Sequence, residues 1–174
     1  MRVLVLLIIS VMVVAEPVLA EEGRVMVVLD GSGSMRGRVD GERKILAAKR
    51  VLGELIDNWD ETDDLGLMAY GHRRTRDCSD IEVLVPVAQF SASRLRSAVE
   101  NVTAKGKTPL SEAVRRAAEA LNHDTQSGTV ILITDGLETC NADPCALGKQ
   151  LAASGIDFRT HVIGFDLAGR NTAA

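Results

Sequence analysis

The chain has 174 residues, with 20 Lys and Arg against 24 Asp and Glu, and a formal net charge of −4. This length favours one domain, because two domains would each be too small to bury an adequate core. A mildly acidic chain is a poor candidate for binding nucleic acid, which requires clustered Lys and Arg. The one basic cluster, at residues 73–76, is followed closely by acidic residues and is interpreted as a solvated loop.

Residues 1–20 have the pattern of a cleavable secretory signal. A basic start at Arg2 precedes an almost wholly apolar run over residues 3–14, and small or modest side chains lead up to Ala20. The run is shorter than the ~20 residues that a helix needs to span a bilayer, which disfavours a retained anchor. No Cys directly follows it, so a lipid anchor is not indicated. We expect cleavage after Ala20, a mature domain over residues 21–174 and a secreted or periplasmic location without a membrane anchor.

The mature chain begins with a strand and a helix. Residues 25–29 are continuously apolar, which predicts a strand buried on both faces. After a loop of Gly and Ser, apolar residues recur at helical spacing over residues 45–59 and form one stripe. Residues 65–70 are predicted to form a second strand and residues 81–85 a third. The third strand is short and stops at Pro86, so we expect it at the edge of the sheet, as its one antiparallel strand.

The second half of the chain continues the alternation. Helices are predicted over residues 92–101 and 110–121, then a fully apolar strand over residues 129–134, a helix over 146–153 and a strand over 158–164. Strands that alternate with helices favour right-handed crossovers. The pattern therefore predicts a doubly wound α/β fold, in which a mostly parallel sheet carries helices on both faces.

Three cysteines, Cys78, Cys140 and Cys145, remain after processing. In an oxidising compartment two of them are expected to form a disulfide. Three pairings are possible, and the sequence does not choose among them. The C-x4-C spacing of Cys140 and Cys145 also resembles half of a zinc site, but no second pair of ligands stands nearby.

Small oxygen-bearing side chains follow two of the predicted strands. The first strand leads directly into Asp30, Ser32 and Ser34, and the strand over residues 129–134 leads into Asp135. Between them, Thr108 opens the longer helix. Ligands of open α/β sheets bind beyond the carboxyl ends of the strands. These five side chains are therefore expected to converge at one edge of the sheet.

Carboxylate and hydroxyl oxygens are hard donors, suited to Mg²⁺, Mn²⁺ or Ca²⁺ and poor for zinc or copper. The alternate spacing from Asp30 to Ser34 lets a tight loop turn every second side chain inward. Gly31 and Gly33 would allow backbone conformations that other residues resist. Five protein oxygens, some acting through water, would leave at least one position of an octahedral cation open. The sequence thus predicts a metal site with room for an incoming ligand.

Each of these residues, taken singly, also suits an ordinary role in a turn or at a helix end. Asp, Gly and Ser are common in turns, and Thr108 before Pro109 suits a helix N-cap followed by proline. Asp30 at the end of a buried strand could instead be a phosphoryl-accepting nucleophile. Phosphatases of that type carry a second Asp two residues later, where this chain has Ser32. His72, near the same edge, is interpreted as a loop histidine without an assigned role.

The pattern Asp30-x-Ser32-x-Ser34, followed by Thr108 and Asp135, resembles the metal-ion-dependent adhesion site of bacterial secreted or periplasmic von Willebrand factor type A (vWA) domains. The resemblance implies a protein-binding domain rather than an enzyme. It implies that the hydroxyl groups contact a bound Mg²⁺ directly, whereas the two carboxylates act through water. A partner's Asp or Glu carboxylate would fill the open position. A vWA domain with a vestigial site, or with a metal that only stabilises the loops, is the structural alternative.

The resemblance extends over residues 23–165. Such domains normally continue with another helix and often a further strand, whereas only residues 166–174 remain here. Either the chain is a truncated form or its sheet lacks one edge, which would expose apolar surface and invite association.

Overall fold

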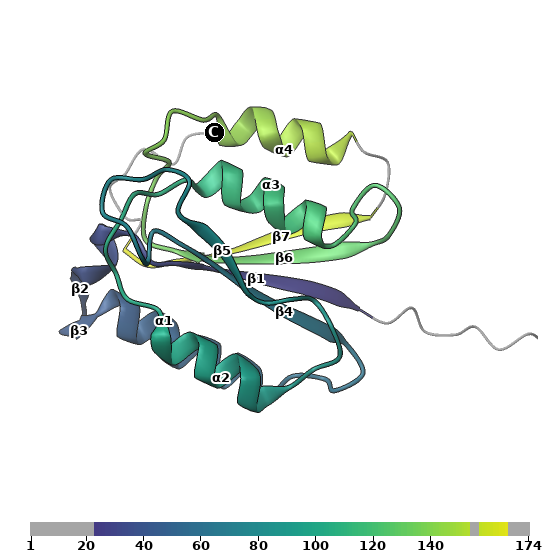
Figure 1. Ribbon diagram of the computed structural model, residues 1–174, viewed down its shortest axis with the longest axis horizontal. Helices are drawn as coiled ribbons and strands as arrows, with labels where there is room; N and C mark the ends of the chain where they lie inside the picture. The colour runs from purple at the N-terminus through teal and green to yellow at the C-terminus, as the bar shows by residue number, and fades with distance from the viewer. Residues whose placement is uncertain (1–22, 154–156, 167–174) are drawn as a thin grey trace, which may run out of the picture.

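The computed structural model describes residues 23–153 and 157–166 (Figure 1). The predicted secretory signal, residues 1–20, lies outside the described residues, so its cleavage stays a prediction. In chain order the elements are β1 (Arg24–Asp30), a short 3-10 helix (Gly33–Arg36), β2 (Arg38–Val39), β3 (Glu42–Arg43), α1 (Lys44–Asp57), β4 (Asp64–Tyr70), β5 (Ile81–Val85), α2 (Ala92–Asn101), α3 (Leu110–Ala120), β6 (Gly128–Thr134), α4 (Pro144–Ala152) and β7 (Phe158–Gly164).

Five strands form one sheet in the order β5-β4-β1-β6-β7. Strands β4, β1, β6 and β7 are parallel to one another, and β5 runs antiparallel to β4 at one edge. The predicted doubly wound α/β fold with one antiparallel edge strand is therefore confirmed. The central strand β1 is buried on both faces, which explains why its sequence is continuously apolar.

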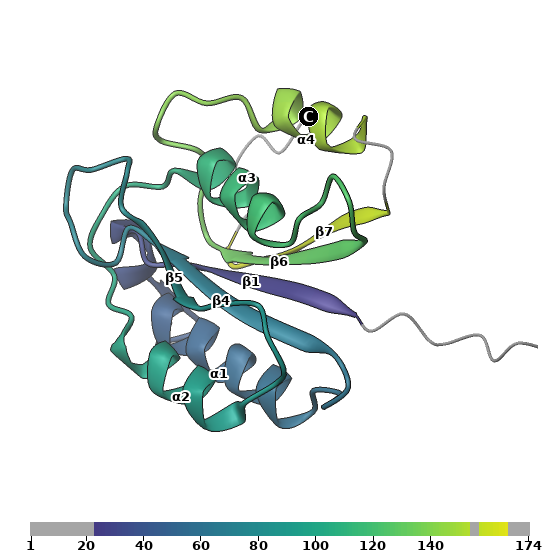
Figure 2. The ribbon, with the colours of Figure 1, turned by 45° about the vertical axis from the view of Figure 1, so that its right-hand side comes forward.

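Helices cover both faces of the sheet (Figures 1 and 2). Helices α1 and α2 lie against one face, and α3 and α4 lie against the other. Successive side chains of a strand point to opposite faces, so β1 contributes to two cores. Val27 packs in the core that contains Leu52 of α1, and Val28 packs in the core that contains Ala117 of α3.

Some element ends differ from the prediction. The apolar stripe of α1 is buried through Ile56, but the helix ends at Asp57, before the predicted Trp59. Trp59 packs against the core from the following loop, where its indole N–H donates a hydrogen bond to the Asp63 carbonyl oxygen at 3.2 Å. Strands β2 and β3 were not predicted. Their two-residue turn, Asp-Gly at residues 40–41, has positive φ at both positions, which is typical of tight hairpins.

The strand β7 forms the other edge of the described sheet. Most of its side chains are exposed, and Val162 is 57% exposed. No helix in the described part of the chain is long and apolar enough to cross a membrane.

The carboxyl ends of β1, β4, β6 and β7 lie at one end of the sheet, on the left in Figure 1. The loops that leave these strands gather there with the β2–β3 hairpin (Figure 1). We call this end the carboxyl edge. It brings together segments from both halves of the chain, because parallel strands all begin at the opposite end.

Candidate metal centre

The innermost predicted site residue, Asp30, ends β1 and is fully buried. One of its carboxylate oxygens accepts a hydrogen bond from the Ser32 backbone N–H at 2.6 Å. The other accepts from the Thr134 hydroxyl at 2.6 Å. Burial raises the pKa of Asp30 above its usual value, although these hydrogen bonds act in the opposite direction. Tyr70 lies behind Thr134, with its hydroxyl 3.2 Å from the Thr134 hydroxyl.

Three of the other predicted residues are linked by short contacts. The Ser32 and Ser34 hydroxyl oxygens lie 2.9 Å apart, and the Ser34 hydroxyl donates to Asp135 Oδ1 at 2.6 Å. Ser32 and Asp135 are buried, whereas Ser34 is exposed and faces solvent. The loop after β1 therefore meets the loop after β6 through a line of oxygens that opens to the surface.

Thr108 lies beside this line of oxygens. A Cβ atom built on Gly136 would lie 3.7 Å from the Ser34 hydroxyl oxygen and 3.9 Å from the Thr108 hydroxyl oxygen. The two hydroxyl groups thus flank the same small space, which a larger residue in place of Gly136 would narrow. The structure brings all five predicted residues to the carboxyl edge.

The oxygen spacing fits an octahedral cation. At the ~2.1 Å bond length of Mg²⁺, neighbouring oxygens of an octahedron lie about 3 Å apart. The 2.9 Å separation of the Ser32 and Ser34 hydroxyl oxygens matches such an edge. The described residues contain no cluster of three or more Cys, His, Asp or Glu that could hold a metal. Any cation here would therefore be bound largely by hydroxyl groups, which suits a hard ion.

Thr108 is held by the segment after β6 and does not cap a helix. Its backbone N–H donates to the Thr139 hydroxyl at 2.8 Å, and the Thr139 N–H donates back to the Thr108 carbonyl at 3.0 Å. Helix α3 begins at Leu110, and its N-cap position is Pro109, without a side-chain cap. The interpretation of Thr108 as an N-cap is therefore wrong. Glu138 instead accepts the Ser111 N–H at 2.9 Å.

Gly31 has a role other than the predicted one. Neither Gly31 nor Gly33 has a positive φ. A Cβ atom on Gly31 would lie 2.6 Å from the His72 Cβ and 2.8 Å from the Tyr70 carbonyl oxygen. Gly31 is therefore needed because β4 ends so close to it. The close approach is fixed by a hydrogen bond from the Gly31 N–H to the Tyr70 carbonyl at 2.8 Å.

A residue that the sequence did not single out, Lys44, also belongs to this centre. Its ammonium group is buried and donates to Asp135 Oδ2 at 2.9 Å. It also pairs with Asp166, just after β7, at 3.1 Å. Burial alone would lower the pKa of Lys44, but the hydrogen bonds and charges of Asp135 and Asp166 outweigh burial and raise it. Nothing in the sequence distinguishes Lys44 from any other residue at the start of a helix.

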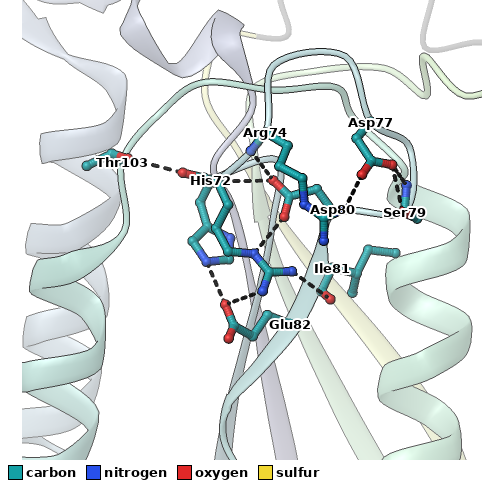
Figure 3. Close-up of polar contacts among 9 residues, drawn as sticks. His72, Arg74, Asp77, Ser79, Asp80, Ile81, Glu82 and Thr103 are labelled. Carbon is teal, nitrogen blue, oxygen red and sulfur yellow. Dashed lines mark hydrogen bonds and ion pairs between the residues drawn. The ribbon is translucent and has the colours of Figure 1, made fainter.

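A loop between β4 and β5, held by many polar contacts, forms one side of the carboxyl edge (Figure 3). Its centre is Asp80, which is fully buried. Asp80 accepts hydrogen bonds from the backbone N–H groups of Arg73 and Arg74, both at 2.8 Å, and from the Arg73 side chain at 2.7 Å. Burial by itself would raise the pKa of Asp80, but these contacts outweigh it and lower the pKa.

His72 is a structural residue of this loop. Its Nε2 lies 3.0 Å from Glu82 Oε2, and its ring is buried (Figure 3). Its carbonyl oxygen accepts a hydrogen bond from the Thr103 hydroxyl at 3.1 Å. His72 therefore connects β4 to the segment that leads to Thr108, and it contacts none of the five predicted site residues among the hydrogen bonds of the described chain.

The disulfide joins Cys78 and Cys140, across a sequence separation of 62 residues. It ties the β4–β5 loop to the loop that follows Asp135. Cys145 is a free, exposed thiol. It lies in the first turn of α4, where Asp143 accepts the N–H groups of residues 145 and 146. Because Cys140 is oxidised, the C-x4-C spacing is not half of a zinc site.

Exposed basic residues lie on the segments that form the carboxyl edge. Four exposed cations, on three loops of the carboxyl edge, have no ion pair among the described residues: Arg36, Arg76, Lys105 and Lys107. The segment that carries the two lysines is fixed against the ends of β1 and β4, since the Lys105 N–H donates to the Gly31 carbonyl at 2.8 Å.

A family model described as the von Willebrand factor type A domain matches residues 25–138, more than half of the chain. The chain belongs to the von Willebrand factor type A family. The match includes all five predicted site residues. The vWA resemblance inferred from the loop motif is thereby confirmed at the level of the family.

The chain is similar to known proteins in sequence and in structure. The vWA chain is 32% identical over 167 residues to the uncharacterised protein YwmD of Bacillus subtilis (strain 168), covering 88% of this chain and 74% of YwmD. The pilus adhesin SpaC of Lactobacillus rhamnosus GG superposes with a TM-score of 0.66 at 16% identity, over 84% of this chain and 25% of SpaC. The manganese-loaded TRAP protein of Plasmodium vivax superposes with a TM-score of 0.61 at 21% identity, over 83% of this chain and 57% of TRAP. At these identities the two structures establish the shared fold alone.

Proposed function

We propose that this vWA domain is an exported binding module that holds a divalent cation at its carboxyl edge and captures an Asp or Glu carboxylate of a protein partner. The observation that carries the proposal is the convergence of three hydroxyl groups and Asp135, with Ser34 open to solvent. A cation bound there would supply a Lewis-acidic position for a carboxylate oxygen.

The chain's own groups are arranged for this task. Ser32, Ser34 and Thr108 would be direct ligands, and they are neutral, so the cation would keep most of its charge for an incoming anion. Asp30 is fully buried and uses both carboxylate oxygens in hydrogen bonds. Its place is behind the hydroxyl groups, where it would act through water or through the Ser32 backbone.

The same geometry disfavours the phosphohydrolase alternative. An attacking carboxylate must present an oxygen to the substrate. Both oxygens of Asp30 instead face hydrogen-bond donors of the protein, and no part of the residue is exposed. None of the relatives above is named as an enzyme. We therefore infer a binding role in preference to catalysis.

An extracellular or periplasmic location fits several observations. A disulfide persists in oxidising compartments, and the loops at the carboxyl edge are joined by one. A pilus adhesin shares the fold. Together with the secretory pattern of residues 1–20, these observations support an exported domain. The preferred cation is expected to be Mg²⁺, with Mn²⁺ or Ca²⁺ as replacements.

Calorimetric titration of Mg²⁺ and Mn²⁺ into the metal-stripped protein tests the proposal. One cation is expected to bind per chain. Asp30→Ala should weaken binding roughly 10- to 100-fold, as is typical when a group that orients metal ligands is lost. Thr108→Ala should weaken it at least as much, because a direct ligand is removed.

Thr103→Ala is the matched control, since this hydroxyl lies on the same segment but contacts the His72 carbonyl. It should bind metal like the parent. Absence of binding by the folded parent, even with added acetate as a surrogate for the partner's carboxylate, would show that the site is vestigial. Binding that Asp30→Ala and Thr108→Ala leave unchanged would place the metal elsewhere.

A further inference from the structure

Lys44 shares Asp135 with the hydroxyl cluster. Asp135 Oδ1 accepts the Ser34 hydroxyl at 2.6 Å, while Oδ2 accepts the Lys44 ammonium at 2.9 Å. Both carboxylate oxygens are thus occupied, one by a proposed metal ligand and one by a cation of the protein. The ammonium group lies within two hydrogen bonds of the exposed Ser34.

The backbone fixes Lys44 in this position. The Gly37 N–H donates to the Ser34 carbonyl at 2.8 Å, and the Lys44 N–H donates to the Gly37 carbonyl at 2.9 Å. A Cβ atom on Gly37 would lie 3.5 Å from the Lys44 Cε, so the turn packs along the lysine stem. The turn that presents Ser34 therefore also delivers the ammonium group. Lys44 is 4% exposed, which shields its charge from solvent.

We propose that Lys44 is a built-in cation of this centre, which keeps Asp135 out of direct metal coordination, weakens the binding of the metal and strengthens the capture of a carboxylate. The inference rests on the proposed function. It assigns Lys44 as a positioning residue that acts through Asp135. If Lys44 only stabilised the fold by pairing with Asp135, its replacement would not shift the metal affinity and the carboxylate affinity of the folded protein in opposite directions.

Charge counting explains the two opposite effects. Asp30 and Asp135 are fully buried carboxylates, so with Lys44 the buried charge is −1. A bound divalent cation would bring it to +1, which attracts an anion. Without Lys44 the metal-loaded centre would be neutral, although the empty centre would attract the cation more strongly. Asp166 is half-exposed and largely screened, so it modulates this balance only weakly.

The first test is calorimetric titration of Mn²⁺ into metal-stripped parent, Lys44→Met and Lys49→Met. Lys44→Met should bind Mn²⁺ at least about tenfold more tightly, because a neighbouring positive charge is removed. Lys49 lies on the same helix, and its ammonium contacts the Glu100 carbonyl outside the centre. Lys49→Met should match the parent. This control separates the local effect from the change in net charge.

The second test adds acetate to each protein saturated with Mn²⁺. Lys44→Met should bind acetate at least about fivefold more weakly than the parent, since its loaded centre is neutral. Tighter metal binding together with weaker anion binding is a combination that damaged folding does not produce, because a distorted site would lose both. Thermal melting followed by circular dichroism verifies that each variant is folded.

Asp166→Asn provides a second variant that does not unpair a fully buried charge. Asp166 draws the ammonium partly away from Asp135, so its loss should weaken Mn²⁺ binding about threefold. Asp124→Asn, at an exposed position outside the carboxyl edge, should leave the Mn²⁺ affinity unchanged. In the Lys44→Met background the effect of Asp166→Asn should disappear.

Equal Mn²⁺ affinity in the parent, Lys44→Met and Asp166→Asn would overturn the role of Lys44 and leave the proposed function standing. If Lys44→Met does not fold, the role of Lys44 is overturned when Asp166→Asn binds Mn²⁺ as tightly as the parent. A folded parent that binds no Mn²⁺ with or without acetate would overturn the proposed function, and this inference with it.

Discussion

Each buried carboxylate at the carboxyl edge is matched by its own set of donors. Asp80 is held by two backbone N–H groups and a guanidinium, Asp30 by an N–H and a hydroxyl, and Asp135 by a hydroxyl and an ammonium. A buried charge without such partners would cost several kcal/mol, roughly. The pKa of Asp30 is raised, because its donors are neutral and do not offset its burial, whereas the pKa of Asp80 is lowered by its backbone N–H groups and the Arg73 guanidinium.

Glu112 offers a test of pH dependence at the residue scale. The Arg115 hydrogen bond is the main cause that lowers the pKa of Glu112 to about 2, with Arg116 adding to it against burial. The pKa of the folded state thus lies below that of the unfolded chain. The ionised carboxylate stabilises the fold above about pH 4.5, and this contribution is lost as the pH falls toward 2.

Glu112→Gln should therefore lower the free energy of unfolding by about 1 kcal/mol at pH 7, a value reduced because the side chain is partly exposed. The difference from the parent should shrink as the pH falls from about 4.5 toward 2. Urea denaturation at a series of pH values measures both. Glu61→Gln, at an exposed position without an ion pair among the described residues, is the control. A difference in unfolding free energy between Glu112→Gln and the parent that stayed constant across this pH range would contradict the lowered pKa of Glu112.

At the scale of elements, the carboxyl edge is assembled from loops that the sheet alone does not align. The Gly106 N–H donates to the Gly71 carbonyl at 2.6 Å, which fixes the segment before Thr108 against the end of β4. The disulfide then ties the β4–β5 loop to the loop after β6. Thr108 is thus positioned by loop-to-loop contacts, while Asp30 and Asp135 are positioned by the strands that precede them.

Removal of the disulfide tests this assembly. Cys78→Ser with Cys140→Ser should lower the free energy of unfolding by up to about 4 kcal/mol, because the bond closes a loop of 62 residues in the unfolded chain. Cys145→Ser, which removes the free thiol, should have little effect. Urea denaturation without reductant measures both. Equal midpoints for the parent and the double variant would mean that the loops hold together without the bond.

For the whole molecule, the net charge is −4, yet four exposed cations on segments of the carboxyl edge, Arg36, Arg76, Lys105 and Lys107, have no ion pair among the described residues. A positive rim accelerates the approach of an acidic partner more than it strengthens the final complex. If the proposed function holds, these cations should therefore affect mainly the association rate of the partner.

Lys105→Glu should lower the association rate of a glutamate-rich peptide with the Mn²⁺-loaded protein at least about threefold at low salt, and the difference should shrink at high salt. Arg94→Glu makes the same charge reversal on α2, outside the carboxyl edge, and should leave the association rate unchanged. Stopped-flow fluorescence measures the rates. If both variants slowed association equally, the net charge of the protein would be the cause, and the cations of the carboxyl edge would have no special role.

Much of the fold could be predicted because it depends on local patterns. Continuous apolar runs marked the strands buried on both faces, helical periodicity marked α1 and α3, and Pro86 marked the edge strand β5. Element ends were less predictable. The end of α1 and the start of α4 depend on particular capping contacts, such as Asp143 with the N–H groups that follow it.

The sequence by itself determined the alternation of strands and helices, and it singled out five oxygen-bearing residues that lie at the carboxyl edge, because each adjoins an element or loop whose pattern is local. Only the tertiary structure decided which cysteines pair and that Lys44 joins the centre. Lys44 is 91 residues from Asp135, and Cys78 is 62 residues from Cys140. No local pattern records such contacts, since they arise only when parallel strands bring distant loops to the same edge of the sheet.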